Sequence, residues 1–286
     1  MCTGFATYYN EPIYGMNFDY IDVDLKLRIH EYGDRRVFAV SFMQKGIKCH
    51  VAGMNSMGVF ANYQVLIPNN KEVYSNFDMP ILALKNFLNP KMKIFERMIP
   101  KLLKECDSVD EILLYLKRYG YYFLPFKNSM KHHSLYADNN KASIYEINNS
   151  GAEIIPMKNK HIVISNFPHA DFKESNYSEV YGFNSEPYKK AKDFLVKEKE
   201  SFSLDKAMKT LEISTRTDGN YITRCSMVFV PKQQEVFICF DRNFEKVWKV
   251  NITKCTIDFC GVKSKDNDIL INKDGILKSK LLKLQP

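Results

Sequence analysis

The sequence has 286 residues, of which 45% are hydrophobic, and it carries a formal net charge of +8 at pH 7. A chain of this length and composition can bury a large core, and we expect a single domain over residues 1–286. No stretch approaches the roughly 18 consecutive apolar residues that a membrane span needs. The N-terminus also lacks a basic segment followed by a long apolar run, so we predict neither a membrane span nor a secretory signal.

The cysteines and the charge pattern exclude several further classes. Seven cysteines without a C-x-x-C pair favour reduced thiols and a cytoplasmic protein. The lysines are spread along the chain, so we predict a solvated surface and no nucleic-acid partner. No group of His, Cys, Asp and Glu has metal-ligand spacing, and the adjacent His132 and His133 would point to opposite faces of a strand. We therefore predict no metal and no cofactor.

The first twenty residues are the strongest candidate for chemistry. Removal of the initiator methionine before a small residue would leave Cys2 with a thiol and a free α-amine. An α-amine titrates near ~7.7–8.0 and a thiol near ~8.5, so the amine can take the thiol proton at neutral pH. Such a residue is a nucleophile that carries its own base. A cysteine at position 2 also occurs by chance, and alone it indicates no function.

The residues after Cys2 predict a β-hairpin. Residues 3–9 are rich in aromatic and β-branched types, Asn10-Glu11-Pro12 is typical of a turn, and residues 13–20 resume the strand. A hairpin of this size returns Asp19 to the start of the first strand. There its carboxylate could hold the terminal ammonium or orient the thiol.

Two later motifs combine a strand with a side-chain amide. Gly53-Met54-Asn55 and Gly58 precede a strand that contains Asn62 and Gln64. The second motif, residues 162–168, is an apolar strand that ends in Asn166 two residues before a proline. From the residues alone, Asn62 is the polar face of a strand and Asn166 an Asx-turn residue.

Together these motifs resemble the choloylglycine hydrolase family, which includes bile salt hydrolases and penicillin V acylases. That family opens with Met-Cys-Thr, and its Gly-Arg-Asn-hydrophobic-Asp turn here reads Gly15 to Asp19. It also has the Gly-Met-Asn-x-x-Gly element and a strand that ends in Thr-Asn-x-Pro. The resemblance implies an α+β fold, the four-layer αββα sandwich of N-terminal nucleophile hydrolases, in which helices flank two antiparallel sheets.

The resemblance also implies a reaction and its residues. The reaction is hydrolysis of a small-molecule, linear N-acyl amide through a thioester. Cys2 would be the nucleophile and Asp19 the carboxylate that orients it. Asn166, with a backbone N–H near Asn62, would hold the oxyanion. A homo-oligomer is left open, because the connection after Asp171 is shorter than in bile salt hydrolases.

Two arginines of the family are absent from this sequence. Met16 replaces the arginine beside the thiol, and Pro187 lies where the second would be. Arg224 is a candidate substitute, although a surface or structural arginine is the simpler interpretation. Without these arginines, bile salts are a poor prediction for the substrate. Two alternatives stay open: an acyltransferase that passes the acyl group to an amine, and a non-catalytic relative that binds amphiphiles.

The remaining elements are expected to support the core. Between Tyr74 and Tyr121, apolar residues such as Leu82, Leu84, Phe87 and Ile94 recur at spacings of three and four, which predicts helices. Pro100 should kink or split this segment, and Ser108 should cap a helix. We expect further helices over 189–195 and 204–211, and strands over 226–230, 235–240 and 245–250. The lysine-rich tail after Cys255 indicates no site.

Overall fold

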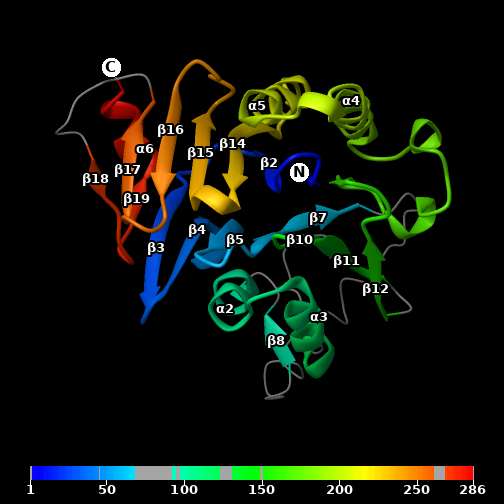
Figure 1. Ribbon diagram of the computed structural model, residues 1–286, viewed down its shortest axis with the longest axis horizontal. Coiled ribbons are helices and arrows are strands. Elements are labelled where there is room, and N and C mark those ends of the chain that lie inside the picture. The colour runs from blue at the N-terminus through cyan, green and yellow to red at the C-terminus, as the bar shows by residue number, and fades with distance from the viewer. Residues whose placement is uncertain are drawn as a thin grey trace.

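The computed structural model describes residues 2–44, 46–67, 92–94, 97–122, 131–148, 151–260 and 268–285. Two large antiparallel sheets stack face to face in it, and helices cover their outer faces (Figure 1). This is the αββα sandwich that the resemblance implies, and that expectation is confirmed. Within the described ranges, no helix has the length and apolar content to cross a bilayer.

The first sheet contains the N-terminal hairpin. Its strand order is β13-β1-β2-β14-β15-β16-β17-β18. The bounds in that order are His161–Ile164, Cys2–Thr7, Ile13–Tyr20, Ile222–Val230, Glu235–Phe240, Val247–Asn251, Thr256–Phe259 and Ile269–Leu270. The hairpin therefore lies between the edge strand β13 and a strand from the C-terminal third of the chain.

The second sheet is built from the middle of the chain. Its order is β12-β11-β10-β6-β5-β4-β3-β19, and β7 pairs with β10 beside this path. The bounds in that order, with β7 last, are Gly151–Pro156, Ala142–Asn148, Lys131–Ala137, Phe60–Asn62, Ile47–Asn55, Arg35–Gln44, Lys26–Tyr32, Ile276–Leu277 and Gln64–Leu66. A separate parallel pair joins β8 (Met92–Ile94) to β9 (Gly120–Tyr122).

The largest buried cluster lies between the two sheets. Alternate residues of each strand enter it, such as Tyr14, Met16 and Phe18 of β2. The other face of β2 carries Asn17, whose amide donates to the carbonyl of Leu211 at 2.8 Å, in helix α5 (Leu204–Ile213). Because helices cover that face as well, β2 is buried on both sides, and its sequence does not show a clean polar alternation.

Helices form the two outer layers (Figure 1). The layer on the second sheet consists of α2 (Met98–Glu105) and α3 (Val109–Arg118), and the layer on the first of α4 (Ser185–Lys197) and α5 (Leu204–Ile213). A short helix, α6 (Lys278–Lys283), ends the described chain, and single 3-10 turns include η2 (Ala170–Phe172), η3 (Tyr177–Glu179), η4 (Lys199–Ser201) and η5 (Pro231–Gln233).

The helix predictions were right in part. Ser108 caps α3 as expected, since its side chain accepts the backbone N–H of Glu111. Pro100 neither kinks nor splits a helix: it lies in the first turn of α2, where its missing N–H has no intrahelical partner to lose. The helical assignment of Ile94 is wrong, because it lies in strand β8. Three other predicted helical positions lie outside the described residues: Leu82, Leu84 and Phe87.

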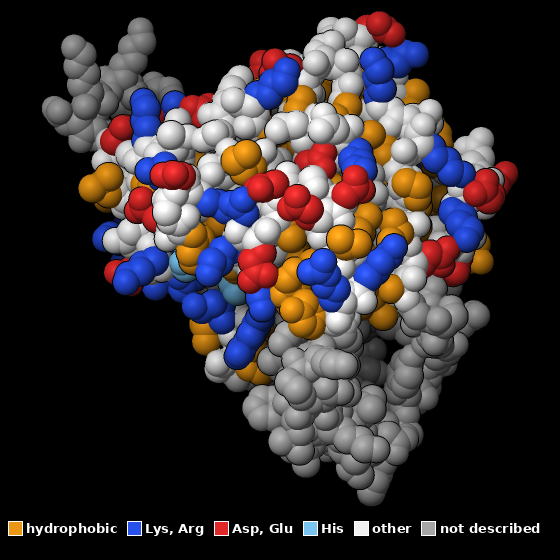
Figure 2. Space-filling model, turned by 60° about the horizontal axis from the view of Figure 1, so that its bottom comes forward, with side chains coloured by type: hydrophobic (Ala, Val, Ile, Leu, Met, Phe, Trp, Pro, Cys, Tyr) orange, Lys and Arg blue, Asp and Glu red, His pale blue; other side chains and the backbone are white. Residues whose placement is uncertain are grey.

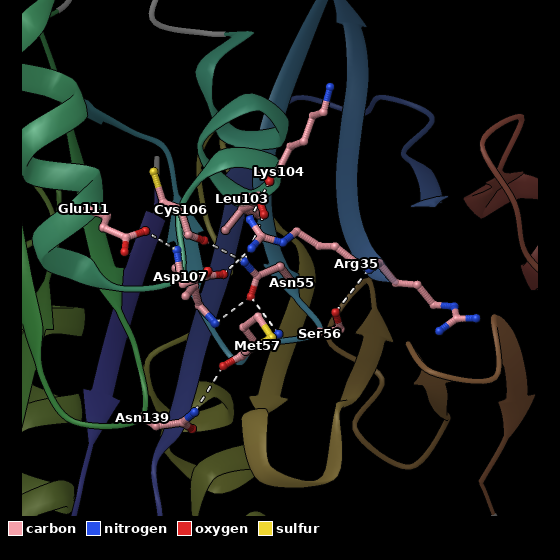
Figure 3. Close-up of polar contacts among 12 residues, drawn as sticks. Arg35, Asn55, Ser56, Met57, Leu103, Lys104, Cys106, Asp107, Glu111 and Asn139 are labelled. Atoms are coloured by element: carbon pink, nitrogen blue, oxygen red, sulfur yellow. Dashed lines mark hydrogen bonds and ion pairs between the residues drawn. The ribbon is translucent and has the colours of Figure 1, made fainter. Parts of the chain in front are cut away.

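Asn55, from the Gly-Met-Asn element, joins α2 to the second sheet (Figure 3). Its side-chain nitrogen donates to the carbonyls of Leu103 (2.9 Å) and Cys106 (3.0 Å) at the C-terminal end of α2. Its side-chain oxygen accepts the backbone N–H groups of Met57 (3.0 Å) and Val59 (2.9 Å). This fully buried side chain therefore satisfies helix carbonyls that would otherwise lack a partner.

The tail after Cys255 completes both sheets. Strands β17 and β18 extend the first sheet, and β19 pairs with β3 of the second. The sequence did not predict these strands. They have only two to four residues each, which is too short for an alternating pattern to be recognised.

Candidate active site

The hairpin brings Cys2 and Asp19 together. In the β1–β2 register Cys2 lies opposite Phe18, so Asp19 is the next residue past the end of β1. The backbone N–H of Asp19 donates to the Cys2 sulfur. Both side chains are buried, with 3% of Cys2 and none of Asp19 exposed. The structure thus gives the proximity that the hairpin prediction requires.

The Asp19 carboxylate is held by two side-chain donors from distant parts of the chain. Thr223 Oγ1 donates to Oδ1 at 2.7 Å, and Asn184 Nδ2 donates to Oδ2 at 3.4 Å. Burial raises the pKa of Asp19 to about 6, while these two hydrogen bonds and the charge of Arg216 oppose the rise. The carboxylate is therefore mostly ionised at neutral pH despite its burial.

A β-bulge directs Thr223 towards this carboxylate. Thr223 pairs with Asp19 across β14 and β2, Cys225 pairs with Phe18, and the extra residue between them is Arg224. The Thr223 hydroxyl oxygen accepts the backbone N–H of Arg216 at 2.8 Å. With that bond made, the hydroxyl hydrogen is directed to Asp19.

Asn166 lies on the other side of Cys2, just after the edge strand β13. Its side-chain oxygen accepts the backbone nitrogen of Cys2 at 2.7 Å and the side-chain amide of Asn184 at 3.0 Å. One hydrogen of its own Nδ2 goes to the carbonyl of Val65 at 2.6 Å. The Cys2 nitrogen would become the α-amine once Met1 is removed. Asn166 thus contacts the nitrogen that we expect from the sequence to act as a base.

Three buried side chains fix the turn that carries Asn166. The ring nitrogen Nε2 of His169 accepts the backbone N–H of Ser165 at 2.9 Å. The backbone N–H of His169 in turn donates to the Glu146 carboxylate at 2.8 Å, and His133 Nδ1 lies 3.4 Å from the same oxygen. Burial lowers the pKa of His169 to about 3, so the ring is neutral and can accept. These hydrogen bonds therefore fix the position of the turn that carries Asn166.

The two adjacent histidines have different partners, as strand alternation predicts. His133 contacts Glu146, whereas the His132 ring stacks on Tyr63 with centroids 4.5 Å apart. Both histidines are buried. They are packing groups and do not form one shared site.

Asn62 and Gln64 project amides towards β1. Asn62 Oδ1 accepts the backbone N–H of Leu135 at 2.7 Å, but its Nδ2 has no hydrogen-bond partner among the described residues. The same holds for both polar atoms of the Gln64 side chain, of which 1% is exposed. A Cβ on Gly4 would lie 3.0 Å from each of the two amide nitrogens. Gly4 thus leaves room for two buried amide nitrogens that have no hydrogen-bond partner among the described residues.

The fold also occurs in solved structures. No family model matches the sequence, and no curated protein sequence matches it. The C2A mutant of a conjugated bile acid hydrolase from Clostridium perfringens superposes with a TM-score of 0.66 at 13% identity, covering 92% of this chain and 97% of that one. The chain has this protein's fold.

Two further structures share it. Penicillin V acylase from Agrobacterium tumefaciens gives a TM-score of 0.64 at 15% identity, covering 97% of both chains. The N-acylethanolamine-hydrolyzing acid amidase orthologue of Caenorhabditis elegans gives 0.55 at 15% identity, covering 80% of this chain and 93% of that one. The resemblance to choloylglycine hydrolases that the motifs indicated is thus confirmed at the level of fold.

Met16, which stands where the family has an arginine beside the thiol, lies in the apolar core. Met16 is fully buried in the core between the sheets and pairs with Gly4 and Met227 in the neighbouring strands. Burial is the main cause that raises the pKa of the Cys2 thiol to about 11. The thiol is therefore protonated at neutral pH.

Arg224 does not replace the missing charge. Its guanidinium lies 3.9 Å from Asp22 and 3.8 Å from Asp241, and its Nε donates to the carbonyl of Tyr20. These contacts support its interpretation as a structural arginine. Arg216 is the arginine whose charge acts on Asp19.

Sequence analysis missed Asn184, Thr223 and Arg216 as neighbours of Asp19. Asn184 precedes α4 with a left-handed backbone (φ 66°), yet its side chain makes no capping bond to that helix. It reaches Asp19 and Asn166 instead. An asparagine before a helix usually caps it, so no local pattern indicated these two contacts.

Proposed function

We propose that the protein hydrolyses a linear N-acyl amide, with Cys2 as the nucleophile after removal of Met1. One observation carries the proposal. The nitrogen of Cys2 lies 2.7 Å from Asn166 Oδ1, while its sulfur accepts the N–H of Asp19. A thiol, a future primary amine, an amide and a carboxylate therefore share one buried place. The shared fold with a bile acid hydrolase, a penicillin V acylase and an acid amidase supports this proposal.

The first half of the reaction forms a thioester. The Cys2 sulfur attacks the carbonyl carbon of the amide, and its proton passes to the α-amine directly or through a water. An amide N–H of Asn166 and a backbone N–H near Asn62 hold the negative oxygen of the tetrahedral intermediate. The ammonium then protonates the leaving nitrogen as the C–N bond breaks, which releases the amine.

In the second half of the reaction, water is the nucleophile in place of the Cys2 thiol. The α-amine takes a proton from a water molecule while the water oxygen attacks the thioester carbonyl. The amine then passes this proton to the sulfur as the C–S bond breaks. The negative charge of Asp19 stabilises the ammonium form of the α-amine, and Asn184 and Thr223 orient the Asp19 carboxylate. Met16 and Phe18 belong to the same buried apolar cluster as Cys2, which favours an uncharged, apolar acyl group.

The decisive test is turnover by the mature protein. We expect hydrolysis of at least one member of a panel of N-acyl amides with varied acyl chains, together with a thioester on the N-terminal peptide detected by mass spectrometry. Cys2→Ser should reduce turnover on the order of 10³-fold or more. Cys106→Ser, which removes another buried thiol in the helical layer, is the matched control and should retain activity.

Two other outcomes would replace the proposal. Transfer of the acyl group to an added amine, in place of release of the acid, would assign an acyltransferase. Binding of the amide with equal affinity by Cys2→Ser and the parent, without turnover by the parent, would assign a non-catalytic amphiphile-binding protein.

A further inference from the structure

The outer face of the second sheet carries a hollow of about 350 Å³ beside α2. Strand β3 contributes His30 and Tyr32 to it, β5 contributes Lys48, and the region of α2 contributes Arg97 and Lys104. Figure 2 shows Lys and Arg side chains gathered around histidine on one side of the face that it presents. The hollow lies on the outer side of the second sheet, whereas Cys2 belongs to the cluster between the two sheets.

Strand alternation explains why the cations gather there. Leu27 and Ile29 of β3 enter the core between the sheets, so Arg28 and His30 lie on the opposite, outer face. In β5 the same rule turns Lys48 outward, because Cys49 faces the core. Cations from two strands and one helix are therefore directed to the same place.

These positive charges are not neutralised by the described part of the chain. Glu105 is the one carboxylate among the residues that line the hollow. Within the described ranges, no ion pair joins Lys48, Arg97 or Lys104 to a carboxylate. Burial and the nearby charges of Arg28, Lys26 and Arg97 lower the pKa of Lys48. The positive charges around the hollow repel one another. A bound anion would remove this electrostatic cost.

The hollow also offers a flat aromatic wall. The rings of His30 and Tyr32 stack with centroids 6.1 Å apart and an interplanar angle of 14°. Lys104 Nζ lies 4.8 Å above the centroid of the Tyr32 ring. This cation–π contact holds the ammonium at the rim of the hollow without neutralising its charge.

We propose that this hollow binds a small molecule that carries several phosphate groups. Lysine ammonium groups attract phosphate as point charges, and the Arg97 guanidinium can bind two of its oxygens at once. The volume is at the lower end of the range for small-molecule pockets, and the cations converge on one hollow. Nucleic acid would require a basic stripe along an extended surface. The proposal is independent of the reaction at Cys2.

The test is calorimetric titration of the full-length protein with inorganic tripolyphosphate. The pocket variant is Lys48→Met with Arg97→Met, and the matched control is Lys160→Met with Lys254→Met, which removes the same charge from exposed positions elsewhere. We expect saturable binding by the parent, a dissociation constant raised about tenfold or more in the pocket variant, and a change below about twofold in the control. Cys2→Ser should bind like the parent.

Folding is checked by the melting temperature of each variant, and Lys48→Gln alone replaces the double variant if that one does not fold. Absence of saturable binding by the parent would overturn the proposal. Equal weakening in the pocket and control variants would do so as well, because it would indicate a general effect of net charge. Saturable binding to phosphatidylglycerol vesicles without binding to tripolyphosphate would assign the patch to a membrane surface instead.

Discussion

The side-chain amide of Asn184 lies between the two polar groups that flank Cys2. Its Nδ2 is 3.0 Å from Asn166 Oδ1 and 3.4 Å from Asp19 Oδ2. One residue at the start of α4 thereby connects the helical layer to both sides of the candidate nucleophile. The connection is possible because the left-handed backbone of Asn184 turns its side chain away from the helix.

We predict that Asn184 is a positioning residue for the reaction. Asn184→Gly keeps access to the left-handed backbone while it removes the amide, so it separates the two properties. We expect kcat to fall about tenfold, in line with the loss of one or two hydrogen bonds to polar groups at the site, with a smaller change in KM. The pH dependence of kcat should also shift, because Asp19 loses a donor that lowers its pKa.

Asn176→Gly is the control for that experiment, since Asn176 starts the 3-10 turn η3 and donates nothing to the site. An Asn184→Gly protein with the pH profile and kcat of the parent would assign Asn184 a purely structural role.

The raised pKa of Asp19 predicts a specific pH dependence of stability. Its pKa is about 6 in the fold and near 3.8 in the unfolded chain, so the folded state binds the proton more tightly. The resulting stabilisation is fully present below pH ~4 and is lost as the pH rises through about 6, a difference of about 3 kcal/mol. Asp19→Asn cannot ionise and should lack this loss.

Urea unfolding of both proteins at pH 4 and pH 7.5 measures the effect. The free energy of unfolding of the parent, relative to Asp19→Asn, should decrease between the two pH values. An unchanged difference would show that the fold does not alter the proton affinity of Asp19.

Glu146 should stabilise the turn that carries Asn166. The side chain accepts the backbone N–H of His169 and contacts His133, and it is fully buried. Glu146→Gln preserves the shape but exchanges a carboxylate oxygen for an N–H donor that faces other donors. We expect a loss of about 1–3 kcal/mol in the free energy of unfolding, measured in urea.

The exposed Glu174 provides a comparison for Glu146. It pairs with Lys158 at 3.0 Å on the surface, so Glu174→Gln should change stability by less than about 1 kcal/mol. Comparable losses in the two variants would contradict the proposed support of the Asn166 turn.

Replacing Asn55 should cost more stability than replacing Asn139, which contacts the turn after Asn55 through the Met57 carbonyl (Figure 3). Asn55→Ala removes four hydrogen bonds and leaves buried backbone groups unpaired, so we expect a loss of about 2–4 kcal/mol. Asn139→Ala removes one exposed bond to the Met57 carbonyl and should cost less than about 0.5 kcal/mol. Thermal and urea unfolding of both variants measure the contrast, and a smaller loss for Asn55→Ala than for Asn139→Ala would refute it.

The sequence by itself determined the local features of the site. Aromatic and β-branched residues around one turn predict the N-terminal hairpin, and strand pairing then brings Asp19 to Cys2. Ser108 predicts the start of α3. These features depend on neighbours in the chain, so a short window of sequence contains their cause.

Only the tertiary structure decided which distant residues complete the site. Asn184 and Thr223 reach Asp19 from 165 and 204 positions away, and the bulge that directs Thr223 exists only when β14 pairs with β2. The short strands of the tail and the cluster of cations beside α2 likewise depend on which strands pair and which faces remain uncovered. No local pattern encodes such contacts, because their free energy comes from elements that meet only when the two sheets have formed.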